Sequence, residues 1–429
     1  MSKPIKVGVI GLGIVGSGTV KALLDNAESI AQKVGAPIIV ARVAVRDITK
    51  PRDVELPAGV LTSNVSDVID DPEIDIVCEL AGGVEPAHSY VLRALENGKS
   101  VVTANKEMMA KAGHDLLKAA EERKIDFLFE GSVAGGIPII QPLKQALAGN
   151  RIREIMGIVN GTTNYILTKM AREGADFDDV LKEAQAHGYA EADPTSDVGG
   201  FDAQYKTAIL ASIAFNSRID VTQIPVEGIT KVTRKDMEMA DLLGYVIKLL
   251  GIGQLDDEGL RVRVHPTLLP KTHPLASVND VYNAIFVRGV PVGDVMFYGR
   301  GAGSGPTGSA VVGDIIEIGR NMVSGATGRL GCTCFNTQPL LPLATLRTKY
   351  YVRLTTHDRP KVLASVANVF GDFDVSIESV DQRPQADGNA EIVLLTHHTI
   401  EQNMMSALEL LNRLPTVASV DNCIRVLAG

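Results

Sequence analysis

The chain has 429 residues, 45% of them hydrophobic, and a formal net charge of −9 at pH 7. This length predicts two or three domains, and the acidic balance disfavours a nucleic-acid partner, which needs basic tracts to neutralise phosphates. The sequence has no apolar run of about 18 residues, no secretory signal and only four scattered cysteines, Cys78, Cys332, Cys334 and Cys423, so we expect a reduced, cytoplasmic protein.

Residues 1–136 alternate short apolar runs with helical patterns. A rhythm of this kind predicts an α/β domain whose parallel sheet carries helices on both faces. The expected strands are 5–10, 37–45, 74–80, 100–105 and 125–130. The expected helices are one from Gly18 onward, 86–97 and 107–123.

The pattern changes near Ile137, and residues 137–340 are expected to form an α+β domain. A glycine-rich loop at 298–314 opens a helix over about 305–324, which we expect to pack back on the N-terminal domain. The other expected elements are strands at 152–160 and 261–269 and a helix at 201–215.

A connector rich in Pro and Leu, 336–347, precedes the tail. Residues 350–429 then read strand, helix, strand, strand, helix, strand. This order predicts a small separate βαββαβ domain.

The segment GLGIVG, residues 11–16, follows a strand and opens a helix. In a dinucleotide site Gly11 allows the tight turn, Gly13 lets the backbone approach the pyrophosphate, and Gly16 permits close packing of helix on strand. The context makes this a strong prediction of a Rossmann-type cofactor site. The other cofactor-contacting residues expected in the turn are Leu12, Ile14 and Val15.

The end of the second strand bears on the choice between NAD and NADP. An acid there binds the ribose 2′-OH, whereas an arginine suits a 2′-phosphate. Arg46 comes first and Asp47 second, with Lys50 and Arg52 close by. NADP is favoured and NAD stays open, and Lys50 and Arg52 also fit ordinary surface charges.

Two lysines are candidates for chemistry. Lys106 follows Thr103 at the carboxyl end of an expected strand, the edge that lines the ligand crevice in open α/β sheets. Lys206 lies four residues after Asp202 on an otherwise apolar helix. A surface ion pair would explain that spacing, but partial burial would make Lys206 a proton donor to a carbonyl oxygen.

The acidic stretch before that helix is a candidate for substrate binding. The glycine pair at 199–200 gives the backbone freedom to bring Glu191 and Asp197 to the same cavity. Their carboxylates would suit the α-ammonium group of an amino acid.

Six segments together resemble homoserine dehydrogenase: GLGIVG, TANK, EGSVAGGIP, IVNGTTNYIL, EADPTSDVGGFDAQYK and GAGSGPTGSAVVGDI. The resemblance covers residues 1–340, and NGTTNYI and EADPTSDVGGFDAQYK are its specific part. It implies reversible NAD(P)H-dependent reduction of L-aspartate 4-semialdehyde to L-homoserine, in threonine, methionine and isoleucine biosynthesis. The middle domain would then bind substrate and build a homodimer or tetramer.

The resemblance also implies roles for single residues. Lys206 would be the acid/base, Lys106 a second catalytic or substrate-facing lysine that also borders the cofactor, and Asp202 a group that orients Lys206. Glu191 and Asp197 would bind substrate. Thr103 and Gly303 would contact the cofactor. A monovalent cation, expected to be sodium, would be held by Glu130 and the backbones of Val133, Gly135 and Ile137, since carbonyl oxygens suit such hard ions.

The tail resembles an ACT domain, a regulatory module that binds amino acids. Threonine feedback is the expectation, with Gln382 as an effector contact. The usual Asp-x-Pro-Gly turn reads Asp358-Arg359-Pro360-Lys361 here, so Lys361 is expected to weaken threonine binding. A tail that only mediates assembly is the alternative.

Two other functions fit parts of the sequence. A phosphorylating semialdehyde dehydrogenase needs an accessible thiolate, but no cysteine opens an expected helix or adjoins a histidine, and Cys78 is expected to be a buried strand residue. Cys332-Thr333-Cys334 is not a zinc spacing and has no matching second pair. A non-catalytic amino-acid sensor is the third possibility, and the lysine and carboxylate set argues against it.

Overall fold

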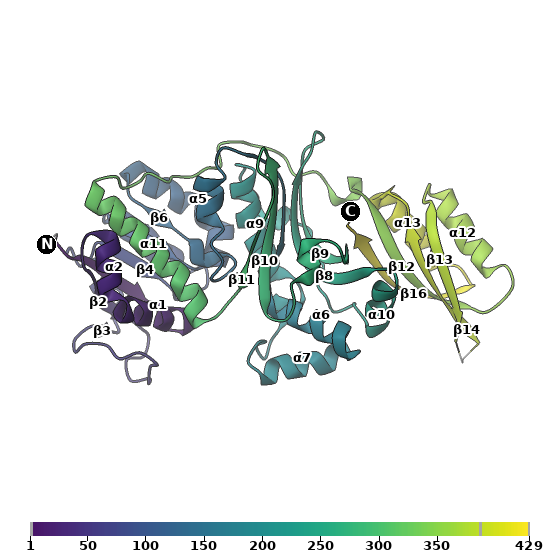
Figure 1. Ribbon diagram of the computed structural model, residues 1–429, viewed down its shortest axis with the longest axis horizontal. Coiled ribbons are helices and arrows are strands. Elements are labelled where there is room, and N and C mark those ends of the chain that lie inside the picture. Colours follow the sequence, from purple (N-terminus) through teal and green to yellow (C-terminus); the bar gives the residue numbers. More distant parts are fainter. Residues whose placement is uncertain (1–2, 386–387, 428–429) are drawn as a thin grey trace. The chain divides into compact units, whose positions relative to one another are not determined.

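The computed structural model describes residues 3–385 and 388–427, and its chain path is drawn in Figure 1. The chain forms two compact units. The first comprises Met1–Val159, Tyr205–Ile224 and Tyr282–Gln338, and the second comprises Asn160–Gln204, Pro225–Val281 and Pro339–Gly429. Among the described residues, no helix combines the length and apolar content needed to cross a bilayer.

The first unit contains the expected parallel sheet, in the order β3-β2-β1-β4-β5-β6. This is the order of a doubly wound dinucleotide-binding fold, whose ligand crevice opens at the carboxyl ends of the strands where the order reverses. The strands are β1 (Ile5–Ile10), β2 (Ile38–Ala44), β3 (Leu61–Thr62), β4 (Ile76–Glu79), β5 (Ser100–Thr103) and β6 (Phe127–Leu128). Cys78 lies fully buried in β4, as predicted.

Six helices accompany this sheet: α1 (Ile14–Asp25), α2 (Ala27–Val34), α3 (Ser66–Ile69), α4 (Ala87–Glu96), α5 (Lys106–Arg123) and α11 (Ser304–Ser324). The first expected helix starts at Ile14 rather than Gly18, because Gly13 is already the residue before the helix. It is also divided in two, because Asn26 leaves helical geometry at φ −113° and ψ 17°.

Helix α11 crosses α1 at very short range, and both lie beside α2 in Figure 1. A Cβ added at Gly18 would lie 2.1 Å from the Ser304 carbonyl oxygen, and one added at Gly308 would lie 2.8 Å from the Gly18 carbonyl carbon. Because such distances are far below van der Waals contact, the two backbones meet only where side chains are missing.

An antiparallel group of strands completes the first unit. Strand β10 (Tyr282–Val290) pairs with β7 (Arg151–Ile158) on one side and with β11 (Gly293–Arg300) on the other. Strand β11 therefore takes up the first residues of the expected glycine-rich loop at 298–314, because Tyr298, Gly299 and Arg300 pair with β10.

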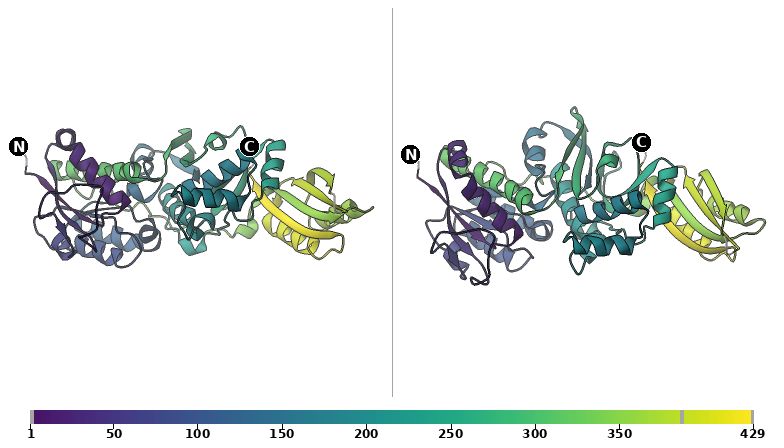
Figure 2. Two further views of the ribbon diagram at one scale, coloured as in Figure 1. Left: turned by 90° about the horizontal axis from the view of Figure 1, so that it is seen from below. Right: turned by 60° about the horizontal axis from the view of Figure 1, so that its bottom comes forward.

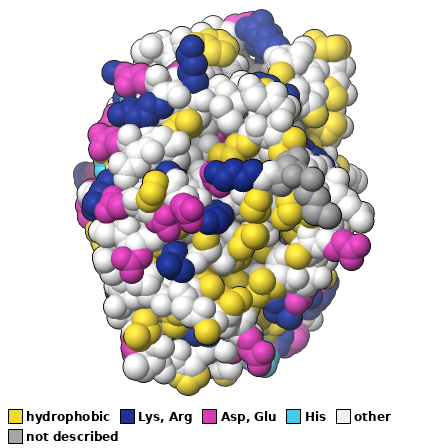
Figure 3. Space-filling model, turned by 90° about the vertical axis from the view of Figure 1, so that its left-hand side faces the viewer, with side chains coloured by type: hydrophobic (Ala, Val, Ile, Leu, Met, Phe, Trp, Pro, Cys, Tyr) yellow, Lys and Arg dark blue, Asp and Glu magenta, His cyan; other side chains and the backbone are white. Residues whose placement is uncertain are grey.

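Acidic, basic and apolar side chains intermingle on the face of the molecule seen in Figure 3.

The second unit contains the remaining middle elements and the tail. Its helices before the tail are α6 (Gly161–Glu173), α7 (Phe177–Ala186), α8 (Thr195–Val198) and α10 (Arg234–Leu242). Its strands before the tail are β8 (Tyr245–Leu255) and β9 (Leu260–Pro270), which form an antiparallel pair. Helix α9 (Phe201–Ala214) begins in the second unit and ends in the first.

The tail has the predicted βαββαβ order, with one short strand added. Its elements are β12 (Arg347–His357), α12 (Val362–Asp372), β13 (Ile377–Pro384), β14 (Asn389–Thr396), β15 (Thr399–Ile400), α13 (Glu401–Leu411) and β16 (Val417–Val426). Its main strands form a sheet in the order β16-β12-β14-β13, and Figure 2 shows them side by side. Ala428, the last residue of the expected final strand, lies outside the described residues.

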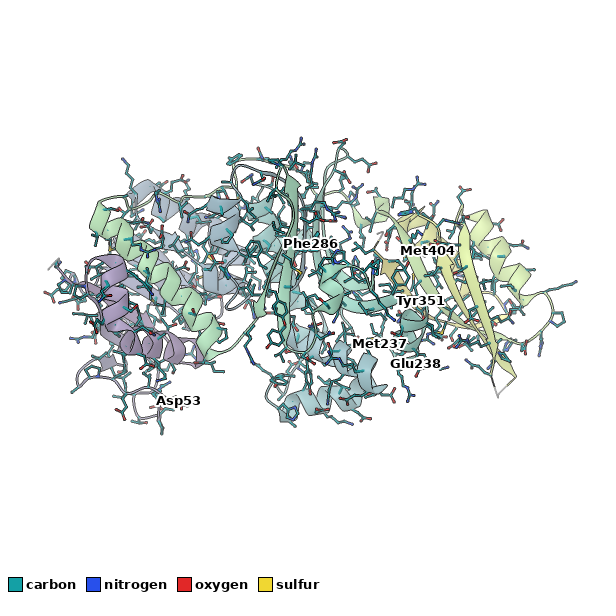
Figure 4. All side chains as sticks on the ribbon, viewed as in Figure 1. Asp53, Met237, Glu238, Phe286, Tyr351 and Met404 are labelled. Carbon is teal, nitrogen blue, oxygen red and sulfur yellow. The ribbon has the colours of Figure 1, made fainter. Side chains whose placement is uncertain are left out.

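The tail joins the rest of the second unit through a pair of strands and a buried carboxylate. Strand β16 pairs in parallel with β9. Asp236 of α10 accepts hydrogen bonds from Arg353 Nε at 2.7 Å and from Tyr351 Oη at 3.1 Å, and Figure 4 shows Tyr351 beside α10. Burial alone would raise the pKa of Asp236, but the Arg353 guanidinium holds that pKa below its usual value. Loss of Asp236 or of Arg353 would leave the other as a buried unpaired charge, which costs about 3–5 kcal/mol.

Gly308→Ala is expected to destabilise the first unit by about 1–3 kcal/mol, because the new methyl group overlaps the α1 backbone. Gly313→Ala, in the same helix, is the matched control: its Cβ would meet nothing within 4 Å, so it is expected to gain up to about 1 kcal/mol of helix propensity. Thermal unfolding of both variants measures the difference. Equal midpoints would contradict this account of the crossing.

Candidate active site

The glycine turn has the geometry that a pyrophosphate needs. Gly11 has a φ of +96°, and a Cβ there would lie 2.7 Å from the Leu80 carbonyl carbon. A Cβ at Gly16 would lie 2.2 Å from the Gly11 oxygen, whereas Gly13 is exposed and a Cβ added there would meet nothing within 4 Å. The first turn of α1 is capped by no side chain, so its N–H groups stay available to an anion.

The other residues of the turn differ in exposure. Leu12 is buried, Val15 is half-buried and Ile14 is 73% exposed. A single exposed apolar side chain is normal on a protein surface, so Ile14 by itself marks no ligand.

The residues after β2 form an exposed loop in which Asp47 is engaged by Thr49. Asp47 accepts from Thr49 N at 2.8 Å and Oγ1 at 2.7 Å, and these two bonds hold the pKa of Asp47 below its usual value. Arg46 is exposed beside it. From the sequence, Arg52 could have been an ordinary surface charge. In the structure its guanidinium donates to the Leu12 oxygen at 3.0 Å and so ties this loop to the glycine turn.

Glu79 organises the next two strand ends and was missed in the sequence. This fully buried carboxylate accepts from Thr103 Oγ1 at 2.8 Å and from Ala81 N at 2.8 Å. Thr103 is therefore turned into the protein. Asn105 caps α5, and Lys106 follows as its first, half-buried residue. The only signal for Glu79 was a charged residue inside an otherwise apolar strand run, IVCEL.

The glycine-rich loop ends beside this cradle. Gly303 is exposed, has a φ of +123° and precedes α11. Because Ser304 touches Gly18, the N-terminus of α11 lies one turn along α1 from the glycine turn. Two helix N-termini therefore converge here, and both favour negative charge.

The loop after Glu130 holds the carboxylate of that residue. The Glu130 carboxylate accepts from the backbone N–H groups of Ile139, Ile140 and Gln141 at 2.6, 2.8 and 2.7 Å. Burial nevertheless raises its pKa. In the described part of the chain, the carbonyl oxygens of Val133, Gly135 and Ile137 accept no hydrogen bond. The Glu130 side chain is therefore already engaged by backbone donors.

The carboxylates of the acidic stretch meet at a residue to which the sequence assigned no role. Asn160 Nδ2 donates to Asp197 Oδ1 at 2.7 Å and to Asp202 Oδ2 at 2.9 Å. Its Oδ1 accepts from Thr163 N at 2.8 Å and caps α6. The available signal was an Asn directly after a strand and before a helix, which is typical of a cap. The Glu191 side chain is exposed in the loop between α7 and α8.

Lys206 is half-buried and held at the end of the β7 segment. Its Nζ donates to the Val159 oxygen at 2.8 Å. The neighbouring Tyr205 ring lies 5.2 Å from Lys111 Nζ of α5, the helix that begins with Lys106. Lys106 and Lys206 therefore both belong to the unit that carries the dinucleotide fold.

The expected effector residues lie on the tail. Gln382 is exposed on β13. Lys361 is exposed at the start of α12 with a φ of +74°, so the turn keeps a left-handed geometry that favours glycine.

The sheet order and the glycine turn define an NAD(P)-binding oxidoreductase. Family comparisons give the same class: the homoserine dehydrogenase NAD-binding domain matches residues 11–130, homoserine dehydrogenase matches 138–316, and the ACT domain matches 350–416. The chain belongs to the homoserine dehydrogenase family and carries a C-terminal ACT domain.

Individual relatives match over nearly the whole length. The chain is 48% identical to homoserine dehydrogenase of Synechocystis sp., covering 99% of this chain and 100% of the relative, and 45% identical to that of Bacillus subtilis, covering 99% and 98%. Among solved structures, a homoserine dehydrogenase from Thiobacillus denitrificans superposes with a TM-score of 0.94 at 45% identity, covering 99% of this chain and 98% of that one.

Asn160→Asp is expected to lower kcat/KM for homoserine by at least about tenfold, because it places a third carboxylate against Asp197 and Asp202. The new side chain still caps α6, so the folded state is expected to survive. Asn160→Ser separates the causes, since it keeps a cap and adds no charge. Steady-state rates measure the effect, and an Asp variant as active as wild type would refute it.

Proposed function

We propose that the chain catalyses the reversible NAD(P)H-dependent reduction of L-aspartate 4-semialdehyde to L-homoserine. The observation that carries this proposal is the half-buried Lys206 ammonium, which donates to the oxygen of Val159, the residue before Asn160. Asn160 holds the two carboxylates Asp197 and Asp202. The ammonium, which can give up a proton, and the carboxylate pair, which can hold an amino acid, thus contact successive residues of the chain.

Lys206 acts as the general acid in the direction of reduction. Its ammonium already donates to a neutral carbonyl, the Val159 oxygen, and the substrate aldehyde offers an oxygen of the same kind. Bound NADPH supplies the hydride. Lys206 then gives its proton to the oxygen as negative charge develops there, which lowers the barrier. In the oxidative direction the neutral amine takes the proton back.

Asp197 and Asp202 provide the negative charge for the substrate α-ammonium group. Asp202 also lies one helical turn before Lys206 on α9, where its charge favours the protonated lysine. The exposed Glu191 is proposed as a further substrate ligand, and Lys106 as a lysine at the cofactor edge.

NADP is the proposed preferred cofactor. The exposed Arg46 and Lys50 suit a 2′-phosphate, while the Asp47 carboxylate is occupied by Thr49. A hyperthermophilic archaeal homoserine dehydrogenase, 27% identical with a TM-score of 0.64, was solved in complex with NADPH. Gly303 and the glycine turn would hold the pyrophosphate, and sodium would bind the carbonyls of Val133, Gly135 and Ile137.

The domain boundaries and the assembly belong to the same proposal. Residues 1–136 would bind the dinucleotide, 137–340 would bind substrate and form a homodimer or tetramer, and 350–429 would regulate the enzyme's activity.

Threonine feedback is supported by a chain of contacts within the second unit. Arg425 of β16 bonds Glu227 at 3.0 Å, and Ile229 N donates to the Val198 oxygen, next to Asp197, at 2.8 Å.

Purified protein is expected to oxidise L-homoserine with NADP⁺ faster than with NAD⁺, measured by absorbance of the reduced cofactor.

Lys206→Ala is expected to lose at least about a hundredfold in kcat with unchanged NADPH affinity, because general acid catalysis contributes about 10²–10⁴-fold. Lys118→Ala is the control for loss of a lysine charge, because Lys118 is an exposed residue of α5 that pairs with Glu122, four residues on. Near-normal turnover of Lys206→Ala would move the proton donor elsewhere.

Lys361→Gly is expected to strengthen threonine inhibition by about tenfold or more, because the smaller residue opens the turn to an amino acid in the same left-handed geometry. Asp374→Gly is the matched control, since it relieves a left-handed residue of the same domain, at φ +55°, outside that turn. Initial rates over a threonine series measure both. An identical threonine response in the two variants would contradict the role of Lys361.

A further inference from the structure

The first unit contains a cavity of about 560 Å³ that the proposed reaction does not use. Helices α5 and α9 and the segment 218–222 form its walls, and its lining includes His114, Leu117, Ile209, Arg218, Cys332 and Cys334. The volume falls within the range of cavities that hold a small organic molecule, and walls that are mostly apolar with a few polar groups are typical of such sites.

The two cysteines in the wall are in contact with each other. The Cys334 backbone N–H donates to the Cys332 sulfur at 3.4 Å, and the Cys334 thiol donates to the Ser212 oxygen of α9 at 3.7 Å. Both are only partly buried, whereas Cys78 is fully buried in the parallel sheet. The cavity therefore gives a small molecule access to a pair of thiols.

The surroundings of the pair favour a thiolate at Cys332. Hydrogen bonds from Cys334 outweigh burial, and the charges of Lys144 and His114 add to them, so the pKa of the Cys332 thiol lies well below its usual value. Lys144 Nζ donates to the Gly331 oxygen at 3.1 Å. The other charged side chains around the pair or its cavity are Lys111, Glu121, Arg218 and Asp220.

The second thiol has the opposite character. Its interaction with Cys332, together with burial, raises the pKa of Cys334. One sulfur is thus poised to attack, while the other keeps its proton until a disulfide has formed beside it. This division between an attacking and a resolving thiol is how protein dithiols exchange with disulfides.

We propose that Cys332 and Cys334 form a thiol–disulfide couple, and that the adjoining cavity admits a low-molecular-weight disulfide as its oxidant. The Cys332 thiolate attacks one sulfur of the small disulfide, whose S–S bond breaks and releases one thiolate. Cys334 then loses its proton and attacks the Cys332 sulfur, which forms the intrachain S–S bond and releases the second thiolate. The two protons lost by the cysteines end on the two released thiols, so one small disulfide is reduced for each protein pair oxidised.

A couple of this kind fits a reducing compartment. Disulfides of intracellular proteins are usually transient or redox-sensing rather than structural. The ring closed across a single intervening residue is small, and strained disulfides are the ones that thiols reduce readily. The reaction depends on neither the cofactor nor Lys206, so it is independent of the proposed dehydrogenase mechanism.

The first test uses the reduced full-length protein with oxidised glutathione and intact-mass and peptide mass spectrometry. Wild type is expected to lose two hydrogens and to link Cys332 to Cys334. Cys334→Ser is expected to hold one glutathione on Cys332, and Cys332→Ser is expected to form neither product. Cys423→Ser, which changes a thiol whose pKa burial raises to about 12, should behave as wild type.

The second test measures the pH dependence of limited alkylation by iodoacetamide. Cys332 of the wild-type protein is expected to react at pH 6 at least about tenfold faster than Cys423, because only a thiolate is nucleophilic. Addition of a monothiol should return the oxidised pair to the reduced form. A wild-type pair that stays reduced with oxidised glutathione, an adduct that forms at Cys423 instead, or alkylation of Cys332 no faster than that of Cys423 would overturn the proposal.

Discussion

The peptide bond between Val159 and Asn160 is the constraint on which the site depends. The oxygen of the first residue accepts from the Lys206 ammonium, and the side chain of the second binds Asp197 and Asp202. The contact of Lys206 and the contacts of the two aspartates are thus made by successive residues of the chain, where β7 has just ended.

Backbone contact at glycine is the second constraint. Gly18 and Gly308 let α11 lie directly on α1, and this brings the N-terminus of a helix from residue 304 next to a turn at residue 11. A dinucleotide cradle made in this way has two helix N-termini instead of one, and each contributes N–H groups and a positive end of a helix dipole. The cradle is thus assembled from distant parts of the sequence.

The ACT domain is joined to the rest of the second unit by buried polar contacts as well as by strand pairing. Asp236 binds Arg353 and Tyr351, and Arg425 binds Glu401 and Glu227. Buried pairs of this kind add little net stability over apolar residues, but each fixes one geometry, since a shifted partner leaves a charge unpaired.

Much of the fold followed from local patterns. The alternation of strands and helices predicted the parallel sheet, the βαββαβ order predicted the tail, and GLGIVG predicted the turn before α1, because these features depend on neighbouring residues. The hairpin β10–β11 and the break at Asn26 were not predicted. Strand β11 is half-exposed and contains Gly and Arg residues, so its pattern differs little from that of a loop.

The site divides in the same way. The sequence by itself determined which chemical groups this protein has: glycines for a phosphate, two lysines, a run of carboxylates and a Cys-x-Cys pair. Only the tertiary structure decided their partners, namely that Glu79 holds Thr103, that Asn160 holds two aspartates, and that His114 and Cys332 share a cavity. The physical reason is that hydrogen bonding and burial act between atoms that are close in space, whereas the residues concerned are up to about two hundred positions apart in the chain.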